Sequence, residues 1–382
     1  MSVRLPAINT VGPVRFAVAA DHLESLGALT RRVIGLRPLI VVAGRRAYRL
    51  AGERALPSLR AAGYEPLLIR VGEGDSHKTL DDARLLWDKL LGLKIDRETA
   101  LLALGGGGVC DLTGFVGSTL LRGLPVVHAP TTLLAQVDAG LGGKTGVDHR
   151  LGKNLIGTFW QPQLSVMDVR TLDTLSGRQI RNGLAEAIKT AFIDGEATWS
   201  SLGRRMEQIA SCDRRNLYWI VKKCCNIKAR VVTVDERETS AIAVPGKKVM
   251  QPGRLALNLG HTVGHALQVL PQGRRLLHGE AVALGMRFAA RIACELGVCE
   301  RESARQLEEM LDRAKLPRRF PAVEWSAVAD IIAGDKKRRG GPEGRILWIL
   351  PERIGRVRIH PIPVRELYSE RLSAVVENGG KS

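Results

Sequence analysis

The chain has 382 residues, 45% of them apolar and 25% charged, with a formal net charge of +18. The basic residues are spread along the sequence with few aromatic residues among them, which argues against a stacking surface for nucleic-acid bases and favours an anionic small substrate. Six cysteines without a C-x-x-C pair indicate reduced thiols, and the absence of a leader-like N-terminus or a long apolar run predicts a cytoplasmic protein.

The first part of the sequence alternates short apolar runs with amphipathic stretches. Strands are predicted at 38–43, 65–71 and 100–104, and helices at 47–62 and 80–93. Alternation of this kind is typical of a parallel, doubly wound sheet. We therefore expect an α/β, Rossmann-like domain at residues 1–177.

From about residue 178 the apolar periodicity becomes helical, with little strand signal. Amphipathic helices are predicted at 180–193, 197–209, 217–231, 260–269, 280–296 and 302–314. We expect these helices to form a second, mostly α-helical domain at residues 178–382. The cleft between the two domains is then the default position for an active site.

The stretch from residue 105 to 154 combines glycine turns with groups that bind phosphate. Four glycines at 105–108 follow a predicted strand and precede Asp111, at the start of a new apolar-periodic segment. A strand, a glycine turn and a helix N-terminus together direct backbone N–H groups at phosphate oxygens. Glycines also serve as plain turn residues, but plain turns do not require the cationic and polar partners found here. Those partners are Lys144, Lys153, Thr131, Thr132 and Asn154.

Three segments offer ligands for a metal ion. His261 and His265 lie four residues apart, on one face of a predicted helix, and His278 and Glu186 come from two other segments. Three of the eight histidines fall within residues 258–280, which favours a metal site over isolated surface histidines. Spacing alone suggests His261 and His265 as the chelating pair.

Motifs along the chain carry a resemblance to a known family. The sequence contains GGGGVCDLTGF, PTTLLAQVD, GGKT and GKNLIG in that order, followed by AEAIK, GHTVGH and HGE. This pattern resembles that of the 3-dehydroquinate synthase family of sugar-phosphate cyclases, over roughly residues 38 to 350. The resemblance implies a phosphorus–oxygen lyase that acts on a seven-carbon keto-sugar acid phosphate. Its route is oxidation by NAD, phosphate elimination, re-reduction, ring opening and aldol closure.

The same resemblance implies two cofactors, NAD and a divalent metal, either zinc or cobalt. The metal ligands are expected to be Glu186, His261 and His278, a set that leaves coordination positions open for substrate oxygens. NAD is expected to contact Asp75, Lys78, Gly107, Gly108, Val109, Asp111, Thr131, Thr132, Lys144, Lys153, Thr171 and Thr174. Asp75 stands where the family usually has glutamate, and Cys110 replaces a glycine of the phosphate turn.

The remaining family positions are expected to contact the substrate. Asp138 and Lys189 are expected to hold its hydroxyl groups, while Lys228 and Arg254 hold its carboxylate. Asn258 is a further expected site residue. A guanidinium fork suits a carboxylate because it donates two parallel hydrogen bonds. The phosphate is expected to contact Lys144, Asn154, His265 and Lys336, with Arg122 reaching in from the partner subunit of a homodimer.

One segment departs from the family pattern. Residues 239–253 intervene between Glu238 and Arg254, where related chains have only a few residues. Two Pro-Gly pairs mark turns, and residues 241–244 and 248–250 are suited to pair as a hairpin. We expect a surface insertion beside Arg254.

Three alternative interpretations stay open. Related cyclases close glucose 6-phosphate or sedoheptulose 7-phosphate into cyclitols, but Arg254, Asn258 and His265 favour a substrate with a carboxylate. A metal-dependent alcohol dehydrogenase of similar fold needs no phosphate pocket, so the lysines at 144, 153 and 336 argue against it. A nucleic-acid-binding protein is supported by the net charge alone.

Overall fold

The computed structural model describes residues 5, 7–20, 22–150, 152–239, 242–243, 250–251, 253–334, 338–339 and 344–378. The chain divides into two compact units, Met1–Gly183 with Ser211–Thr233, and Leu184–Ala210 with Val234–Ser382. The single domain boundary expected after residue 177 stays a prediction. The compact units differ from it because helix α7 (Arg214–Val234) packs on the first unit: Thr233 Oγ1 donates a hydrogen bond to Val11 O at 3.0 Å.

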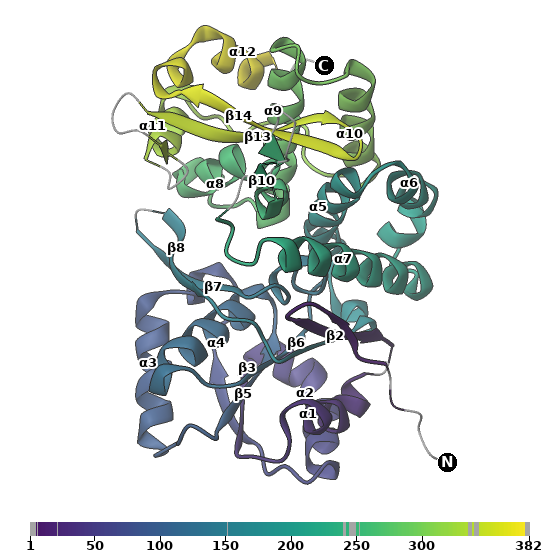
Figure 1. The fold of residues 1–382 in the computed structure, drawn as a ribbon, viewed down its shortest axis with the longest axis vertical. Helices are drawn as coiled ribbons and strands as arrows, with labels where there is room; N and C mark the ends of the chain where they lie inside the picture. The colour runs from purple at the N-terminus through teal and green to yellow at the C-terminus, as the bar shows by residue number, and fades with distance from the viewer. Residues whose placement is uncertain are drawn as a thin grey trace. The chain divides into compact units, whose positions relative to one another are not determined.

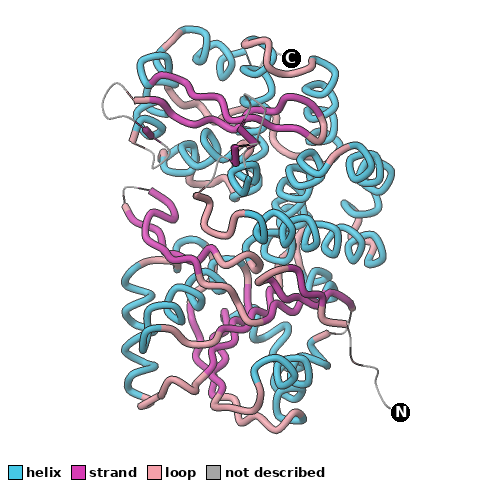
Figure 2. The backbone as a smooth tube through the Cα atoms, viewed as in Figure 1, coloured by secondary structure: helices cyan, strands magenta, loops and turns pink. Residues whose placement is uncertain are grey.

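The first unit is built on a seven-stranded sheet with the order β1-β2-β9-β6-β5-β3-β4 (Figures 1 and 2). Its neighbouring strands are parallel except for β1 and β2, which confirms the predicted doubly wound α/β architecture. The strands are β1 (Asn9–Val11), β2 (Val14–Ala19), β3 (Leu39–Gly44), β4 (Leu67–Val71), β5 (Ala100–Gly105), β6 (Val126–Pro130) and β9 (Leu164–Asp168).

Helices cover both faces of this sheet, so its central strands are apolar on both sides. Val41 packs in one core cluster with residues of α1 (Leu26–Ile34) and α2 (Arg45–Ala61). Its neighbours Ile40 and Val42 pack in another cluster, with residues of α3 (Leu80–Gly92) and α4 (Gly107–Thr119). Alternate residues of β3 therefore enter opposite cores, as the period of a strand requires.

Shorter elements follow the sheet strands of the first unit. A two-stranded antiparallel hairpin pairs β7 (Lys144–His149) with β8 (Gly152–Phe159). One π-helical turn, η4 (Ala135–Ala139), follows β6. The 3-10 turns are η1 (Leu23–Ser25), η2 (Asp75–His77), η3 (Leu120–Arg122) and η5 (Val169–Thr174).

The second unit is mostly helical, as predicted, but it also contains a sheet. Its helices are α6 (Glu196–Ala210), α8 (His261–Val269), α9 (His278–Glu295), α10 (Arg301–Arg313), α11 (Trp325–Ala333) and α12 (Glu370–Asn378), with turns η6 (Gly253–Asn258), η7 (Pro271–Gly273) and η8 (Val364–Tyr368). Helix α5 (Gly177–Asp194) runs from the first unit into the second.

The expectation of little strand structure after residue 178 was wrong for the end of the chain. Strands β12 (Arg338–Arg339), β13 (Arg345–Arg353) and β14 (Arg356–Pro363) form an antiparallel sheet, and α9 packs against β13. Gly355, with φ +83°, makes the tight turn between the two long strands. Residues 346–351 of β13 form a continuous apolar run, which periodicity alone cannot distinguish from a buried helix segment.

The predicted hairpin within residues 239–253 is confirmed for the residues that the structure describes. Strand β10 (Ile242–Ala243) pairs antiparallel with β11 (Met250–Gln251), and β11 contacts β14. The other residues of the predicted hairpin lie outside the described part of the chain. Its surface position stays a prediction.

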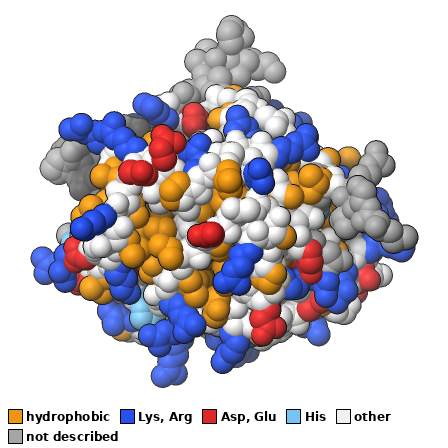
Figure 3. All heavy atoms as spheres, turned by 90° about the horizontal axis from the view of Figure 1, so that it is seen from below, with side chains coloured by type: hydrophobic (Ala, Val, Ile, Leu, Met, Phe, Trp, Pro, Cys, Tyr) orange, Lys and Arg blue, Asp and Glu red, His pale blue; other side chains and the backbone are white. Residues whose placement is uncertain are grey.

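Two whole-chain properties agree with the composition. No helix in the described ranges is both long enough and apolar enough to cross a bilayer. Lysine and arginine side chains are scattered between acidic ones over the face drawn in Figure 3, rather than gathered into one patch. On this face, the positive charge is therefore spread over the surface.

Candidate active site

Two helices of the second unit bring three histidines together because glycines let them approach closely. His261 opens α8, His265 lies one turn later, and His278 opens α9. A Cβ atom on Gly285 of α9 would lie 1.8 Å from the backbone oxygen of Gly260, and Gly260 is the residue just before α8. Only glycine permits this approach of the backbones.

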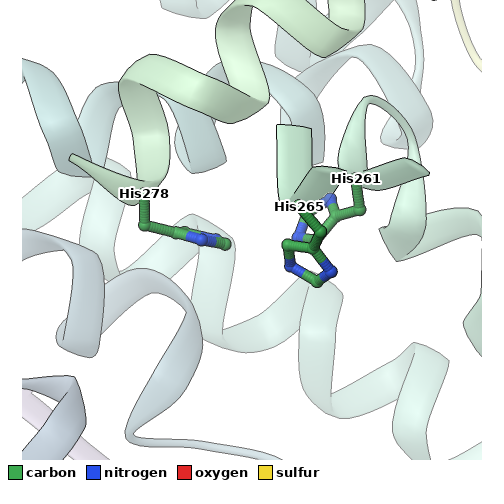
Figure 4. Close-up of side chains that lie close together, drawn as sticks. All are labelled: His261, His265 and His278. Atoms are coloured by element: carbon green, nitrogen blue, oxygen red, sulfur yellow. The ribbon is translucent and has the colours of Figure 1, made fainter. Parts of the chain in front are cut away.

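The three imidazole rings form one cluster (Figure 4). A nitrogen of each of His261, His265 and His278 lies within 4.8 Å of the other two. Glu186, on α5, extends this set: its Oε1 lies 3.6 Å from His261 Nε2 and 3.4 Å from His278 Nε2. The predicted ligands Glu186, His261 and His278 therefore do converge, with His265 beside them.

The chemistry of these donors fits a divalent ion. Glu186 is fully buried, and its Oε1 accepts no hydrogen bond from the described residues. His261 Nδ1 lies 3.2 Å from Leu259 O; a carbonyl can only accept, so Nδ1 donates there, and in the neutral ring Nε2 then presents its lone pair toward Glu186. A buried carboxylate facing imidazole lone pairs is costly alone and favourable around a cation.

Lys189 lies one turn after Glu186 on α5 and forms an ion pair with Glu186 Oε2. Its side chain is almost completely buried, so the ammonium is held beside Glu186 and the histidine cluster rather than in solvent. This position suits the predicted contact with a substrate hydroxyl.

In the first unit, the glycine turn leads into α4 as predicted. Gly106 is the N-cap, so the N–H groups of Gly107 and Gly108 precede the first intrahelical hydrogen bond and remain available to an anion. A Cβ on Gly107 would lie 3.1 Å from Ala139 Cβ, and one on Gly108 would lie 3.1 Å from Gly74 O. The turn is thus in close contact with the loop that carries Asp75 and Lys78.

Lys78 connects this loop to the phosphate turn and to the β7–β8 hairpin. Its Nζ lies 2.6 Å from Asp111 Oδ2, donates to Asn154 Oδ1 and lies 4.0 Å from Asp148 Oδ1. Burial raises the pKa of Asp111 above its usual value, although the Lys78 ammonium opposes that shift. Three residues predicted from separate motifs, Lys78, Asp111 and Asn154, therefore meet in one network.

Asp148 belongs to the same network and was missed by the sequence analysis. Its Oδ1 accepts a hydrogen bond from Asn154 N at 2.9 Å, where Asn154 has φ +56°, and Lys78 O accepts one from Asp148 N at 2.7 Å. The signal available was an acidic residue between the two Gly-Lys pairs. The side chain of Asp75 lies outside the described part of the structure, and only its backbone, in η2, is placed.

The predicted threonines line the ends of β6 and β9. Thr131 N donates to Gly105 O at 2.9 Å, and Thr132 Oγ1 accepts from Ala135 N at 3.3 Å. Thr171 and Thr174 lie in η5, where Thr174 Oγ1 donates to Thr171 O at 2.9 Å. Val109 is buried in the first turn of α4.

Buried Gln136 joins these two strand ends and was also missed. Its Nε2 donates to Pro130 O at 3.0 Å and to Asp168 O at 2.9 Å, and it lies 3.1 Å from Thr171 Oγ1. Its position within the PTTLLAQVD motif was the available signal.

Asp138 lies in the π-helical turn and is held by α7. Lys228 Nζ donates to Asp138 O at 2.6 Å and forms an ion pair with the carboxylate, and Cys225 Sγ lies 3.3 Å from Gln136 O. Single π-turns are frequent at functional sites, since they redirect one side chain. Lys144, at the start of β7, is exposed, and Lys153, in β8, is partly exposed.

The other predicted substrate residues are spread over the chain. Arg254, in the second unit, is fully buried and its Nη1 donates to Glu236 O at 2.6 Å, while Asn258 Nδ2 donates to Glu238 Oε1. Arg122 is exposed in η3. Lys336 lies outside the described residues.

Sequence models of one family match most of the chain. The model described as 3-dehydroquinate synthase N-terminal matches residues 68–182, and 3-dehydroquinate synthase C-terminal matches residues 183–338. The curated 3-dehydroquinate synthase of Pelotomaculum thermopropionicum is 38% identical over 353 residues, which cover 92% of this chain and 91% of that protein. The 3-dehydroquinate synthase of Pelobacter propionicus is 42% identical over 321 residues, which cover 84% of this chain and 86% of that protein.

A solved cyclase shares the fold. The structure of 2-deoxy-scyllo-inosose synthase, complexed with carbaglucose-6-phosphate, NAD+ and Co2+, has a TM-score of 0.82 to this chain. The two are 22% identical, and the match covers 98% of this chain and 100% of that one. At this identity the likeness concerns the fold.

Proposed function

The chain belongs to the 3-dehydroquinate synthase family, and from that premise we propose that it is a phosphorus–oxygen lyase of the shikimate route. It converts 3-deoxy-D-arabino-heptulosonate 7-phosphate (DAHP) to 3-dehydroquinate and phosphate. The observation that carries this proposal is the likeness to relatives of that name across nearly the whole chain. NAD, when bound, accepts and returns a hydride, and a divalent metal polarises the substrate hydroxyl.

The chain's own residues are proposed to hold the nucleotide and the metal. The free N–H groups of Gly107 and Gly108 receive the pyrophosphate, because they lie at a helix N-terminus. Glu186, His261 and His278 hold the metal, supported by the buried carboxylate oxygen between two imidazole nitrogens. The neighbouring cyclase, whose crystals contained NAD+ and Co2+, is consistent with this pair of cofactors.

Substrate binding is proposed to use the cations and carboxylate described above. Arg254 and Lys228, with Asn258, hold the substrate carboxylate, and Asp138 and Lys189 orient its hydroxyl groups. The phosphate contacts Lys144, Asn154 and Lys336. His265 remains to bind substrate or transfer a proton, since an imidazole titrates near neutral pH.

The experiment incubates the purified chain with DAHP, a catalytic amount of NAD and zinc, and follows phosphate release. We expect many phosphates per NAD, because the nucleotide returns to its oxidised state. Glucose 6-phosphate serves as the parallel substrate for a cyclitol-forming cyclase. Turnover of glucose 6-phosphate without phosphate release from DAHP would reject the proposal.

We also propose a homodimer in which Arg122 contacts the phosphate bound by the partner subunit. Leu121, Arg122 and Gly123 have φ values of +51°, +68° and +119°, and the exposed Arg122 lies in the middle of this strained turn. Mixing inactive Arg122→Ala with inactive His265→Ala should restore measurable activity, because a mixed dimer has one complete site. No recovery in a confirmed mixed dimer would mean that Arg122 does not act across subunits.

A further inference from the structure

A pocket of about 370 Å³ lies in the first unit, beside the end of β4 and the first half of α3. Its lining includes three cations, Arg45, Arg70 and Lys89, and the carboxylates of Glu73 and Asp82. None of these residues has a role in the proposal above. Arg45, Arg70 and Glu73 lie at the ends of β3 and β4, and such strand ends of a Rossmann-like sheet are where nucleotides bind, which makes these residues candidates for contact with the nucleotide.

Glu73 is held at the N-terminus of α2. Its Oε1 accepts a hydrogen bond of 2.9 Å from the N–H of Ala47, the third residue of that helix. Its Oε2 accepts no hydrogen bond from the described residues. A Cβ atom on Gly44 would lie only 2.2 Å from Glu73 Oε1, so the lack of a side chain there lets this carboxylate occupy the strand end.

This strand end neighbours the phosphate turn. Gly44 is the register partner of Val71, where β3 and β4 end, and Ala43 is that of Leu104, just before the glycines. In dinucleotide-binding sheets the pyrophosphate lies at the glycine turn, and an acidic residue that follows the turn in sequence hydrogen-bonds the adenosine ribose hydroxyls. Glu73 precedes the turn in this sequence, but its carboxylate lies at the end of β3, the strand next to β5. We infer that Glu73 is this acidic residue and that it selects NAD against the 2′-phosphorylated dinucleotide, NADP. The inference rests on the proposed use of NAD.

The other groups of the pocket explain why one carboxylate decides the selectivity. Within the described ranges, Arg45, Arg70 and Lys89 form no ion pair, and Arg70 lies over the ring of Tyr48, 4.8 Å from its centre. Asp82 is engaged in capping α3, where it accepts a hydrogen bond from Thr79 N at 3.2 Å. Glu73 therefore supplies the negative charge that opposes a 2′-phosphate, which the three cations would otherwise attract.

The test measures the dissociation constants of NAD and NADP for the parent chain and two matched variants by calorimetry, without substrate. Glu73→Gln keeps an oxygen that accepts from Ala47 N–H but removes the charge. Glu65→Gln removes the same charge before the start of β4, at the opposite edge of the sheet. We expect Glu73→Gln alone to lower the ratio Kd(NADP)/Kd(NAD), by roughly tenfold, because hydrogen bonds to charged groups are the stronger ones.

Adding Arg45→Ala to Glu73→Gln should reverse the gain in NADP affinity. A parent that binds NAD while Glu73→Gln keeps the parental ratio would overturn this inference and leave the proposed function intact. The inference would also be overturned if Asp75→Asn changed the ratio Kd(NADP)/Kd(NAD) while Glu73→Gln left it unchanged. A parent that binds neither dinucleotide would count against the use of NAD, and so against both proposals.

Discussion

His265 and His278 present the same imidazole group to one cluster but come from different helices. His278 opens α9 and its Nε2 faces the buried Glu186 carboxylate, whereas His265 lies one turn into α8, after His261. Sequence spacing pairs His261 with His265, and the family resemblance pairs His261 with His278. The geometry brings the three histidines together, so the metal content of single variants distinguishes the two pairings.

We expect His278→Ala to lose bound metal, because it removes a nitrogen that faces Glu186. His265→Ala should keep the metal and lose turnover. Metal content measured by mass spectrometry after dialysis checks both variants, and a chelator should abolish phosphate release until zinc or cobalt is added. Equal metal loss in the two variants would favour His261 and His265 as the chelating pair.

Under the proposed function, Arg254 distinguishes a cyclase for a carboxylated substrate from one for a sugar phosphate that has no carboxylate. Removing one partner of a buried charge pair costs about 2–5 kcal/mol. Arg254→Ala should therefore lower kcat/KM for DAHP by roughly two to three orders of magnitude. Steady-state phosphate release measures this, and Arg254→Lys should recover only part, since an ammonium cannot donate the two-pronged contact.

The buried position of Arg254 requires a control for folding. Its Nη1 donates to Glu236 O, so the thermal midpoint and metal content of both variants must be measured beside their activity. Unchanged metal content with reduced activity is the expected result. Parental turnover of DAHP by Arg254→Ala would show that the carboxylate is held elsewhere.

At the scale of elements, the packing of α8 on α9 brings His261, His265 and His278 together in the proposed metal site. Two ligand-bearing helices approach until the backbones of Gly260 and Gly285 touch, which places His261 and His278 with ring centres 5.4 Å apart. Helices separated by ordinary side chains lie 8–10 Å apart at their axes. The glycines at this contact therefore set how closely His261 and His278 approach each other, although they carry no side chain themselves.

We expect Gly285→Ala to destabilise the second unit and to weaken metal binding together. The added methyl would overlap a backbone oxygen, and overpacking of this kind costs about 3 kcal/mol or more. Urea unfolding and metal titration measure the two effects. Gly92→Ala, at the end of α3, is the matched control: its Cβ would meet no atom within 4 Å, so stability should hold or rise slightly. Normal metal affinity in Gly285→Ala would contradict the argument.

At the scale of the whole molecule, one buried histidine makes stability depend on pH. His128, in β6, is buried, its Nδ1 lies 3.1 Å from Gly140 O, and its Nε2 has no hydrogen-bond partner in the described structure. Burial lowers the pKa of His128 to about 4. When the pH is above 6.5, near the ordinary pKa of histidine, the His128 ring is neutral in both the folded and the unfolded chain. As pH falls below that value, the unfolded chain binds a proton that the folded chain refuses.

The free energy of unfolding should therefore fall as the pH drops from about 6.5 toward 4. Between about pH 7.5 and about pH 5, His128 alone should lower the free energy of unfolding by about 2 kcal/mol. Urea unfolding of the parent and of His128→Asn isolates the effect, since an asparagine amide can still donate to Gly140 O and does not titrate. Parallel pH profiles in the two chains would mean that His128 is not responsible.

The sequence by itself determined the local structure and the chemical inventory. The strand at 100–104, the helix predicted at 280–296 and the glycine turn before Asp111 all lie within a few residues of their predicted bounds. Such features depend on neighbours in the chain: the period of apolar residues, the conformational freedom of glycine and the position of a carboxylate near a helix start. The candidate ligands Glu186, His261 and His278 could likewise be named, from the family resemblance, before any contact was known.

Only the tertiary structure decided which of these residues meet. Lys78 joins Asp111 and Asn154 across sequence separations of 33 and 76 residues, and no local periodicity reports such a pairing. Glu73 gained its position because Gly44, on another strand, has no side chain to exclude it. The pairing of β13 with β14 and the packing of α7 on the first unit were likewise decided by tertiary structure. Each depends on the shape of a partner surface that forms only when distant segments fold together.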